Sequence, residues 1–251
     1  MSGVTDTSTR LMVAAFSYVN LCARTRPLTK GSTLLGVRGR PVPSGHAIIP
    51  VISSTRLDAK KLDENDKNDI KIYTDGSGKG GNVGAAAVLY HGGEIPEVSR
   101  YHLGKKSTYS VFEGECLGQL LGLGLLEQKL FLRSMLDQRR AKYTVSVAVD
   151  SQESLLCHHI SKVRMARRSP IIREIHQAYS RILSMYPDVS IGFRWVPAHE
   201  GIRGGDEADM QAKLATKGAD HNTPDAVQYS RLKPVLAGSR VETVCQVPSE
   251  P

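Results

Sequence analysis

The feature that most constrains the fold of this chain is an ordered series of strand-like and helix-like segments in its middle part. Five short runs are rich in apolar and β-branched residues, at 70–75, 83–90, 97–103, 143–150 and 189–196. The first three follow one another across short turns that contain glycine, which predicts an antiparallel meander. The last two alternate with helix-like segments. The order β-β-β-α-β-α-α-β-α predicts an α/β fold, with a mixed five-stranded sheet and helices on both faces.

Helical periodicity places the helices between these strands. Leucine recurs at helical spacing from Ser110 to about Leu132, and Ser110 forms a candidate capping box with Glu113 at the start of this segment. Four glycines inside the segment would destabilise an isolated helix, so we expect them to allow close packing against the sheet. Further helices are expected at 151–159, 170–186 and 204–216.

The segments outside residues 70–217 have the composition of flexible chain. Residues 1–57 are basic, with Asp6 as their one carboxylate, and we expect a disordered arm. Their Ser, Thr and Arg content is also similar to that of a mitochondrial transit peptide, and the remnant of an upstream domain is a further alternative. Residues 58–69 are predicted to be a charged, solvated linker, and residues 218–251 a flexible C-terminal tail.

Charge and cysteine content narrow the classes of function. The chain of 251 residues has a formal net charge of +8, which favours a polyanionic partner such as nucleic acid, although many soluble proteins are mildly basic. Its longest apolar runs are too short to span a bilayer, so no membrane partner is expected. The four cysteines are far apart and form no CxxC pair, which argues against a zinc site and fits a reducing compartment.

Carboxylates stand at the ends of four apolar segments, at Asp75, Glu115, Asp150 and Asp209. Each has an ordinary structural explanation. Asp75 precedes a glycine, as in many hairpin turns, and Asp150 precedes a helix that it could cap. Glu115 and Asp209 lie in the first turns of helices, where the helix dipole favours acids, although Glu113 fits that explanation better than Glu115 does.

Taken together, the four carboxylates indicate a metal site. Strand ends and helix starts at one edge of an α/β sheet can converge on one crevice, where carboxylates repel one another unless a cation neutralises them. Magnesium ions prefer oxygen ligands, and two of them about 4 Å apart can clamp a phosphoryl group during in-line displacement. A basic chain with a carboxylate metal site therefore points to a nuclease.

The chain resembles type 1 ribonuclease H, of the kind found in retrotransposon reverse transcriptases, across about residues 70–217. The resemblance is carried by four motifs in the family's order: Thr74-Asp75-Gly76-Ser77, Gly114-Glu115, Asp150-Ser151-Gln152, and the stretch from Trp195-Val196-Pro197-Ala198-His199 to Ala208-Asp209. The last motif is the specific one. The chain departs from the family at Ala198 and at Gly205-Asp206, where glycine and Asn-Glu are usual.

The resemblance implies a role for each motif. The four carboxylates would ligate two Mg²⁺ ions, for which Mn²⁺ is a possible substitute. His199 would assist proton transfer or product release from a mobile loop. Ser77 and Gln152 would lie near the RNA strand, and Ser110 would contact a DNA phosphate, with helix capping as its ordinary alternative. His158 and His159 have no such motif, so we expect them on the surface.

The resemblance implies an endoribonuclease that hydrolyses the RNA strand of RNA–DNA hybrids by two-metal-ion catalysis. A non-catalytic nucleic-acid-binding module derived from a retroelement is the alternative from another class, and metal-dependent turnover would discriminate between the two. A DNA recombinase of the same fold family is disfavoured by the long motif. We expect an intracellular monomer in the nucleus or cytoplasm, or in the mitochondrion if the N-terminal arm is a transit peptide.

Overall fold

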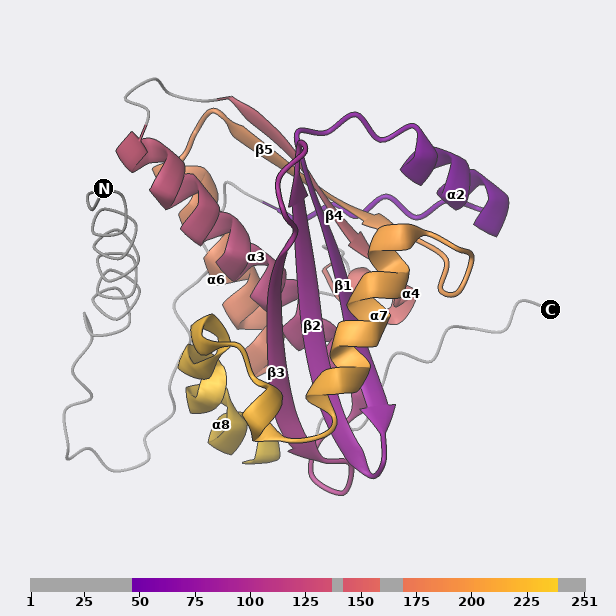
Figure 1. The fold of residues 1–251 in the computed structure, drawn as a ribbon, viewed down its shortest axis with the longest axis vertical. Coiled ribbons are helices and arrows are strands. Elements are labelled where there is room, and N and C mark those ends of the chain that lie inside the picture. The colour runs from indigo at the N-terminus through magenta and orange to yellow at the C-terminus, as the bar shows by residue number, and fades with distance from the viewer. Residues whose placement is uncertain (1–46, 137–141, 159–168, 239–251) are drawn as a thin grey trace, which may run out of the picture. The chain divides into compact units, whose positions relative to one another are not determined.

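A five-stranded mixed sheet forms the centre of the protein (Figure 1). The computed structural model describes residues 47–136, 142–158 and 169–238. The sheet has the strand order β3-β2-β1-β4-β5, antiparallel between β1, β2 and β3 and parallel from β1 through β4 to β5. The strands are β1 (Ile70–Lys79), β2 (Asn82–His91), β3 (Glu97–Lys105), β4 (Tyr143–Val149) and β5 (Val189–Trp195). This is the α/β fold with a mixed five-stranded sheet that the order of segments predicts.

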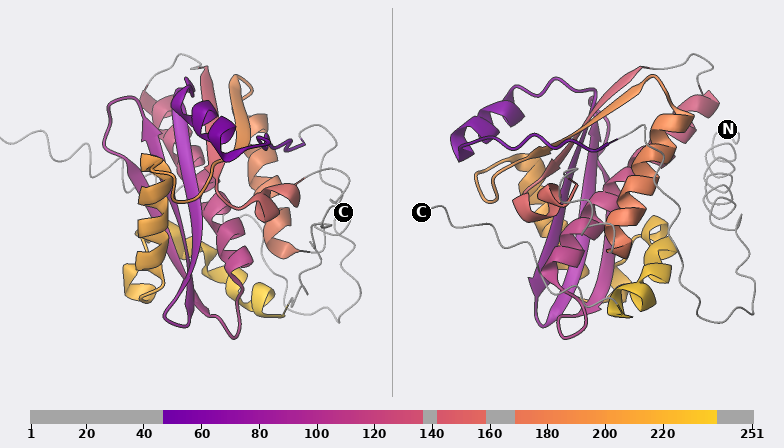
Figure 2. Two further views of the ribbon diagram at one scale, coloured as in Figure 1. Left: turned by 90° about the vertical axis from the view of Figure 1, so that its right-hand side faces the viewer. Right: turned by 180° about the vertical axis from the view of Figure 1, so that it is seen from behind.

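Helices cover both faces of the sheet (Figure 2). Helices α3 (Val111–Leu136) and α6 (Pro170–Met185) pack on one face, and α7 (Arg203–Ala215) packs on the other. The short helix α4 (Gln152–Leu156) directly follows β4. The larger apolar core includes buried side chains of α3 and α6. None of the helices in the described ranges has both the length and the apolar character needed to cross a membrane.

The start of α3 has the local geometry that its sequence predicts. The backbone nitrogen of Ser110 donates to Glu113 Oε2 at 2.7 Å, and the backbone nitrogen of Glu113 donates to Ser110 Oγ at 3.2 Å, which completes the capping box. A Cβ atom added at Gly118 would lie 2.9 Å from the carbonyl oxygen of Asp75. The predicted close packing of α3 on the sheet is therefore confirmed, and it requires glycine.

The predictions for residues 47–69 are wrong, because this segment is folded onto the sheet. Val51 forms a parallel bridge with Arg194 of β5, and its backbone nitrogen donates to the carbonyl of Phe193 at 2.9 Å. Helix α2 (Arg56–Glu64) replaces most of the predicted linker, with Thr55 as its N-cap. The remainder of the predicted N-terminal arm, residues 1–46, lies outside the described residues.

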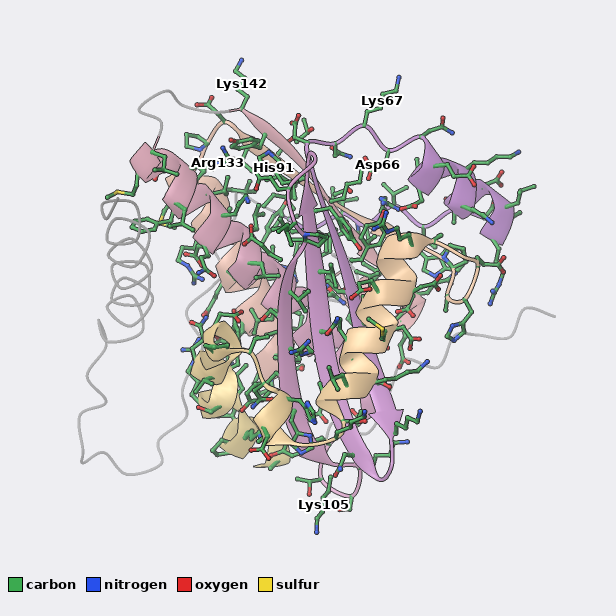
Figure 3. The ribbon with its side chains drawn as sticks, viewed as in Figure 1. Asp66, Lys67, His91, Lys105, Arg133 and Lys142 are labelled. Carbon is green, nitrogen blue, oxygen red and sulfur yellow. The ribbon has the colours of Figure 1, made fainter. Side chains whose placement is uncertain are left out.

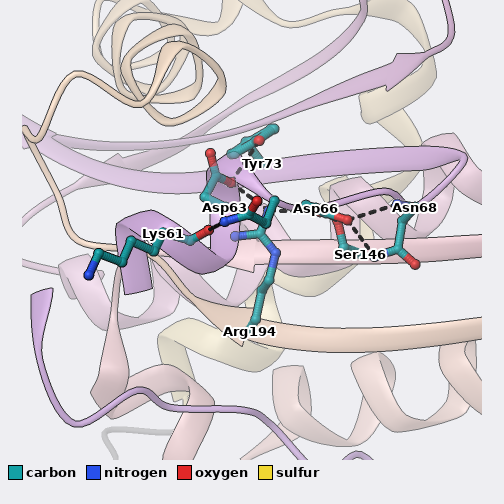
Figure 4. Close-up of polar contacts among 8 residues, drawn as sticks. Lys61, Asp63, Asp66, Asn68, Tyr73, Ser146 and Arg194 are labelled. Atoms are coloured by element: carbon teal, nitrogen blue, oxygen red, sulfur yellow. Dashed lines mark hydrogen bonds and ion pairs between the residues drawn. The ribbon is translucent and has the colours of Figure 1, made fainter. Parts of the chain in front are cut away.

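A buried arginine explains why the acidic segment at the end of α2 is not solvated (Figure 4). Arg194 Nη2 lies 2.6 Å from Asp63 Oδ1 and 3.0 Å from Asp66 Oδ2. The Tyr73 hydroxyl also donates to Asp63, at 2.9 Å, and the Ser146 hydroxyl donates to Asp66. The segment thus supplies counter-charges for a guanidinium that is only 6% exposed. Buried charges of this kind require such partners.

The described part of the predicted C-terminal tail is also ordered. It forms η1 (Ala219–His221), η2 (Pro224–Leu232) and α8 (Lys233–Gly238). Its apolar side chains join the larger core, at Ala226, Tyr229, Leu232 and Leu236. The Ser99 hydroxyl of β3 donates to the Asp225 carboxylate at 2.5 Å. The prediction of a flexible tail is therefore wrong up to residue 238, and residues 239–251 lie outside the described residues.

Ion pairs fasten α3 to the turn between β2 and β3. Lys129 Nζ, whose side chain is 10% exposed, lies 2.7 Å from Glu97 Oε1 and also contacts Glu94. Arg133 pairs with Glu94 as well, and His91 Nδ1 lies 3.3 Å from it. Figure 3 shows His91 and Arg133 close together at this end of the molecule. The pairs hold the C-terminal half of α3 against the sheet.

Candidate active site

Carboxylates from three separate elements meet where the parallel pairing of β1 with β4 ends, at Thr74 and Val149. Asp75 lies in β1, Glu115 lies in α3, and Asp150 directly follows β4. One carboxylate oxygen from each lies within 4.8 Å of the other two. Asp75 is 7% exposed and Glu115 is 9% exposed, so both are largely removed from water. The predicted convergence is confirmed for these three acids.

The fourth acid and the histidine lie in the same pocket. Asp209 of α7 and His199 of the β5–α7 loop line it together with Asp75 and Asp150. Asp209 lies outside the group of three acids, and its Oδ2 atom accepts from Lys213 Nζ at 2.6 Å. The imidazole of His199 is exposed, and its backbone is left-handed, with a φ of 57°. The five predicted catalytic residues therefore lie close together in space, and they differ in how deeply each is buried.

Neighbouring groups fix the position of Asp150. The Trp195 indole nitrogen donates to the backbone carbonyl of Asp150 at 3.0 Å, which ties the ends of β4 and β5 together. Ser151, rather than Asp150, is the N-cap of α4, because its hydroxyl accepts from the backbone nitrogen of Ser154 at 3.2 Å. The capping explanation for Asp150 is therefore wrong, and its carboxylate is available to the site.

Burial and mutual repulsion make these acids difficult to ionise together. Burial, reinforced by the charges of Asp150 and Asp209, raises the pKa of Asp75 to about 8. Burial also raises the pKa of Glu115, and the charges of Asp150 and Asp75 raise it further. The pKa of Asp150 is raised by burial too, although the nearby His199 opposes the shift. A cation among these oxygens would favour the ionised forms of all three acids.

The donor atoms of the cluster suit a divalent cation. Among the described residues, Glu115 Oε2 and Asp150 Oδ1 are buried and have no hydrogen-bond partner. Buried polar atoms normally have partners, so unpaired carboxylate oxygens within one cluster indicate a missing positive ligand. Hard divalent cations prefer such oxygen ligands. The residues that could hold the cation are Asp75, Glu115 and Asp150, with Asp209 beside them.

The residues predicted to contact nucleic acid lie around the acids rather than in the pocket. Ser77 is buried in β1, whereas Ser110 and Gln152 are exposed at the starts of α3 and α4. None of these three is among the described residues that line the pocket. Thr74 does line it, and its buried hydroxyl has no partner. The sequence signal for Thr74 was its place directly before Asp75 in the first motif.

Gly76 sets the distance between two of the acids, and its replacement by alanine should separate them. A Cβ atom here would overlap the backbone nitrogen of Glu115 and lie 2.5 Å from the carbonyl carbon of Gly114. Because these are backbone atoms, α3 must move away from β1. We expect Gly76→Ala to destabilise the fold by about 1–3 kcal/mol and to weaken divalent-metal binding, measured by urea denaturation and titration calorimetry.

A second glycine provides the matched control. Gly192 lies in β5, and a Cβ atom added there would meet nothing within 4 Å. Gly192→Ala should therefore leave both metal affinity and the denaturation midpoint close to their wild-type values. Equal behaviour of Gly76→Ala and Gly192→Ala would contradict the proposed contact between β1 and α3.

Comparisons with known proteins show a likeness of fold. No protein-family model matches the chain, and no curated protein sequence matches it at a significant level. One similar structure is the N-terminal RNase H domain of a Mycobacterium tuberculosis protein, solved as a fusion with maltose-binding protein. The two sequences are 20% identical and the TM-score is 0.39. The match covers 61% of this chain and 97% of that one. LC11-RNase H1, isolated from compost by a metagenomic approach, matches at 19% identity and a TM-score of 0.38, with 60% and 96% covered.

Proposed function

We propose that this protein is a metal-dependent endoribonuclease of the ribonuclease H type, of the kind found in retrotransposon reverse transcriptases. Its substrate would be the RNA strand of RNA–DNA hybrids. Its products would carry 3′-hydroxyl and 5′-phosphate ends. Recognition would depend on the RNA 2′-hydroxyl groups and on the shape of the minor groove rather than on base sequence.

The observation that carries the proposal is the three-acid cluster with its unpaired oxygens. Within the part of the chain that the structure describes, Glu115 Oε2 and Asp150 Oδ1 are buried without partners, and both belong to a group of acids whose oxygens lie within 4.8 Å of one another. If the cluster served only the fold, these buried atoms would stay without hydrogen-bond partners. Each would then cost about 1–3 kcal/mol of stability, or more if charged. The formal charge of +8 supports a nucleic-acid substrate.

Each residue of the site has a distinct part in the proposed reaction. The carboxylates of Asp75, Glu115, Asp150 and Asp209 would hold the ions and set their spacing. Two Mg²⁺ ions, or Mn²⁺ in their place, would supply activation of water and stabilisation of the leaving oxygen. His199 is exposed at the pocket, where its imidazole can exchange protons with substrate and solvent. Ser77, Ser110 and Gln152 would contact the hybrid.

Cleavage of three labelled duplexes tests the proposal. Purified full-length protein with Mg²⁺ should cut the RNA strand of an RNA–DNA hybrid and leave RNA duplex and DNA duplex intact. Chelation with EDTA should abolish the cleavage. Hybrid binding without metal-dependent turnover would overturn the proposal and favour the non-catalytic module. Cleavage of DNA duplex instead would indicate a nuclease with a different substrate.

His199→Ala should slow turnover without removing the metal site. The imidazole lies in the pocket but outside the group of acids that could hold a cation. We expect a loss of about 10²-fold or less in kcat, at or below the lower end of the usual range for one general acid or base, which is about 10²- to 10⁴-fold. Titration calorimetry should show nearly wild-type Mg²⁺ affinity in the same variant.

His199→Asn separates the loss of the imidazole from backbone strain. His199 has a φ of 57°, and asparagine tolerates this left-handed region better than alanine. If both variants lose the same fraction of kcat, the missing imidazole is the cause. If either variant loses Mg²⁺ binding as completely as a variant of Asp75 does, His199 is a ligand or a structural residue, and the division of roles is wrong.

A further inference from the structure

A chain of buried polar side chains crosses the core behind the carboxylates. Gln119 of α3 donates from Nε2 to Ser154 Oγ of α4 at 2.8 Å, and Ser154 Oγ donates to the carbonyl oxygen of Ser151 at 3.0 Å. His158 Nε2 lies 2.7 Å from Gln119 Oε1, and its Nδ1 atom lies 3.3 Å from His176 Nε2 of α6. Gln119, Ser154 and His158 are all 0% exposed.

The prediction that His158 lies on the surface is therefore wrong. Its two ring nitrogens have partners on two other helices, Gln119 on α3 and His176 on α6. Burial, together with the neighbouring His176, lowers the pKa of His158 to about 3, so the ring is neutral at physiological pH. His159, its predicted companion, lies outside the described residues.

Every hydrogen bond in this series of buried side chains has a defined direction. Because Gln119 Oε1 can only accept, the His158 Nε2 atom must carry the proton. The Nδ1 atom of the neutral His158 ring must then accept from His176 Nε2. Donation therefore runs in one direction, from His176 through His158, Gln119 and Ser154 to the carbonyl of Ser151. Hydrogen bonds aligned in this way polarise and strengthen one another.

This series of hydrogen bonds connects two helices. Helix α3 carries Glu115, and α4 begins two residues after Asp150. Gln119 lies four residues after Glu115, which places the two side chains on the same side of α3, one turn apart. At the other end, Ser151 directly follows Asp150 and caps α4. Apolar side chains could fill the same core without the cost of burying polar groups. Fully paired polar groups, in contrast, hold the two helices in one fixed geometry.

We propose that Gln119, Ser154 and His158 are positioning residues, which fix the distance between Glu115 and Asp150 by joining α3 to the start of α4. The inference rests on the proposed function, because the acids matter as ligands of a cation. It assigns these residues no contact with substrate or metal. Outer partners of metal ligands commonly change metal affinity or activity by about 10- to 100-fold when they are lost.

The test uses Gln119→Leu in the full-length protein, with Tyr229→Phe as the matched control. The control removes another buried hydrogen bond to α3, from the Tyr229 hydroxyl to the carbonyl of Leu120 at 3.4 Å, which does not involve α4. We expect Gln119→Leu to weaken Mn²⁺ binding by about 10-fold in calorimetry and to lower kcat about as much. The KM for the hybrid should not change. Tyr229→Phe should change none of these values.

A second variant keeps the test decisive if Gln119→Leu does not fold. Ser154→Ala removes one hydroxyl from the same chain and should weaken Mn²⁺ binding in the same direction. The double variant should be no worse than Gln119→Leu alone, because both changes break one chain of bonds. Additive losses would show two independent effects and would overturn the inference.

The outcomes separate the inference from the proposed function. If the wild type binds Mn²⁺ and cleaves hybrid, but Gln119→Leu and Ser154→Ala match Tyr229→Phe in metal affinity and kcat, the chain serves only core packing and the inference fails. If the wild type binds Mn²⁺ but cleaves no hybrid, the proposed function fails, and the metal affinities of the variants still decide the inference. A wild type that binds neither Mn²⁺ nor Mg²⁺ overturns both.

Discussion

Asp75→Asn should abolish hybrid cleavage and leave the fold intact. The substitution keeps the size of the side chain but removes one negative charge from a group whose oxygens lie within 4.8 Å of one another. Loss of an outer partner of a metal ligand costs about 10- to 100-fold in activity. Loss of a ligand itself should therefore exceed 100-fold. The measurement is the single-turnover rate on labelled hybrid at saturating Mg²⁺.

The same substitution should stabilise the metal-free protein, with a defined pH dependence. Burial and the charges of Asp150 and Asp209 raise the pKa of Asp75 from 3.8 to about 8. Between these values the folded protein holds a proton that the unfolded chain releases, so the free energy of unfolding falls as pH rises through this window. Asparagine cannot ionise. In Asp75→Asn, the free energy of unfolding should therefore fall with pH only by the amount that Glu115 and Asp150 cause.

Urea denaturation in EDTA at several pH values between 4 and about 8 measures this difference. Glu153→Gln is the matched control, because Glu153 lies in the first turn of α4, close to Asp150 in sequence but outside the three-acid group. It should retain both the wild-type rate and the wild-type pH slope. A near wild-type rate in Asp75→Asn would remove Asp75 from the metal site, whatever its stability.

The sheet and the three-acid cluster could be predicted because their signals are local. The Val-rich run of β4 ends one residue before Asp150, and the capping box from Ser110 to Glu113 spans only four residues. The burial of Glu115 follows from its small neighbours and from the glycines that let α3 approach β1. The functional roles of His199 and the serines stay predictions, because the structure places these residues without showing what they bind.

The remaining features depend on partners far away in the sequence. The acidic stretch at the end of α2 looks solvated until Arg194, 131 residues from Asp63, is placed beside it. The burial of His158 depends likewise on Gln119, 39 residues before it. A charged or polar side chain is predicted to be exposed by default, since burial is costly without a partner. Sequence patterns show which side chains are costly to bury, but not the distant partners that offset this cost.

Arg194→Met should therefore strongly destabilise the fold. It keeps an unbranched side chain but leaves Asp63 and Asp66 without their cation, although these side chains are only 12% and 2% exposed. Removing one partner of a buried ion pair typically costs about 3–5 kcal/mol. Because residues 47–69 are held to β5 by this contact, we also expect faster proteolysis of α2 in the variant.

An exposed ion pair elsewhere in the chain provides the control. Arg181 donates to Glu127 through two nitrogens, at 2.8 and 2.7 Å, but its side chain is 47% exposed, so Arg181→Met should cost clearly less than Arg194→Met. Urea denaturation at pH 7 measures both variants. Adding Asp63→Asn and Asp66→Asn to Arg194→Met should restore much of the lost stability, since the uncompensated charges are then gone. A cost for Arg194→Met no larger than that for Arg181→Met would show that α2 and the segment after it are held to the sheet by other contacts.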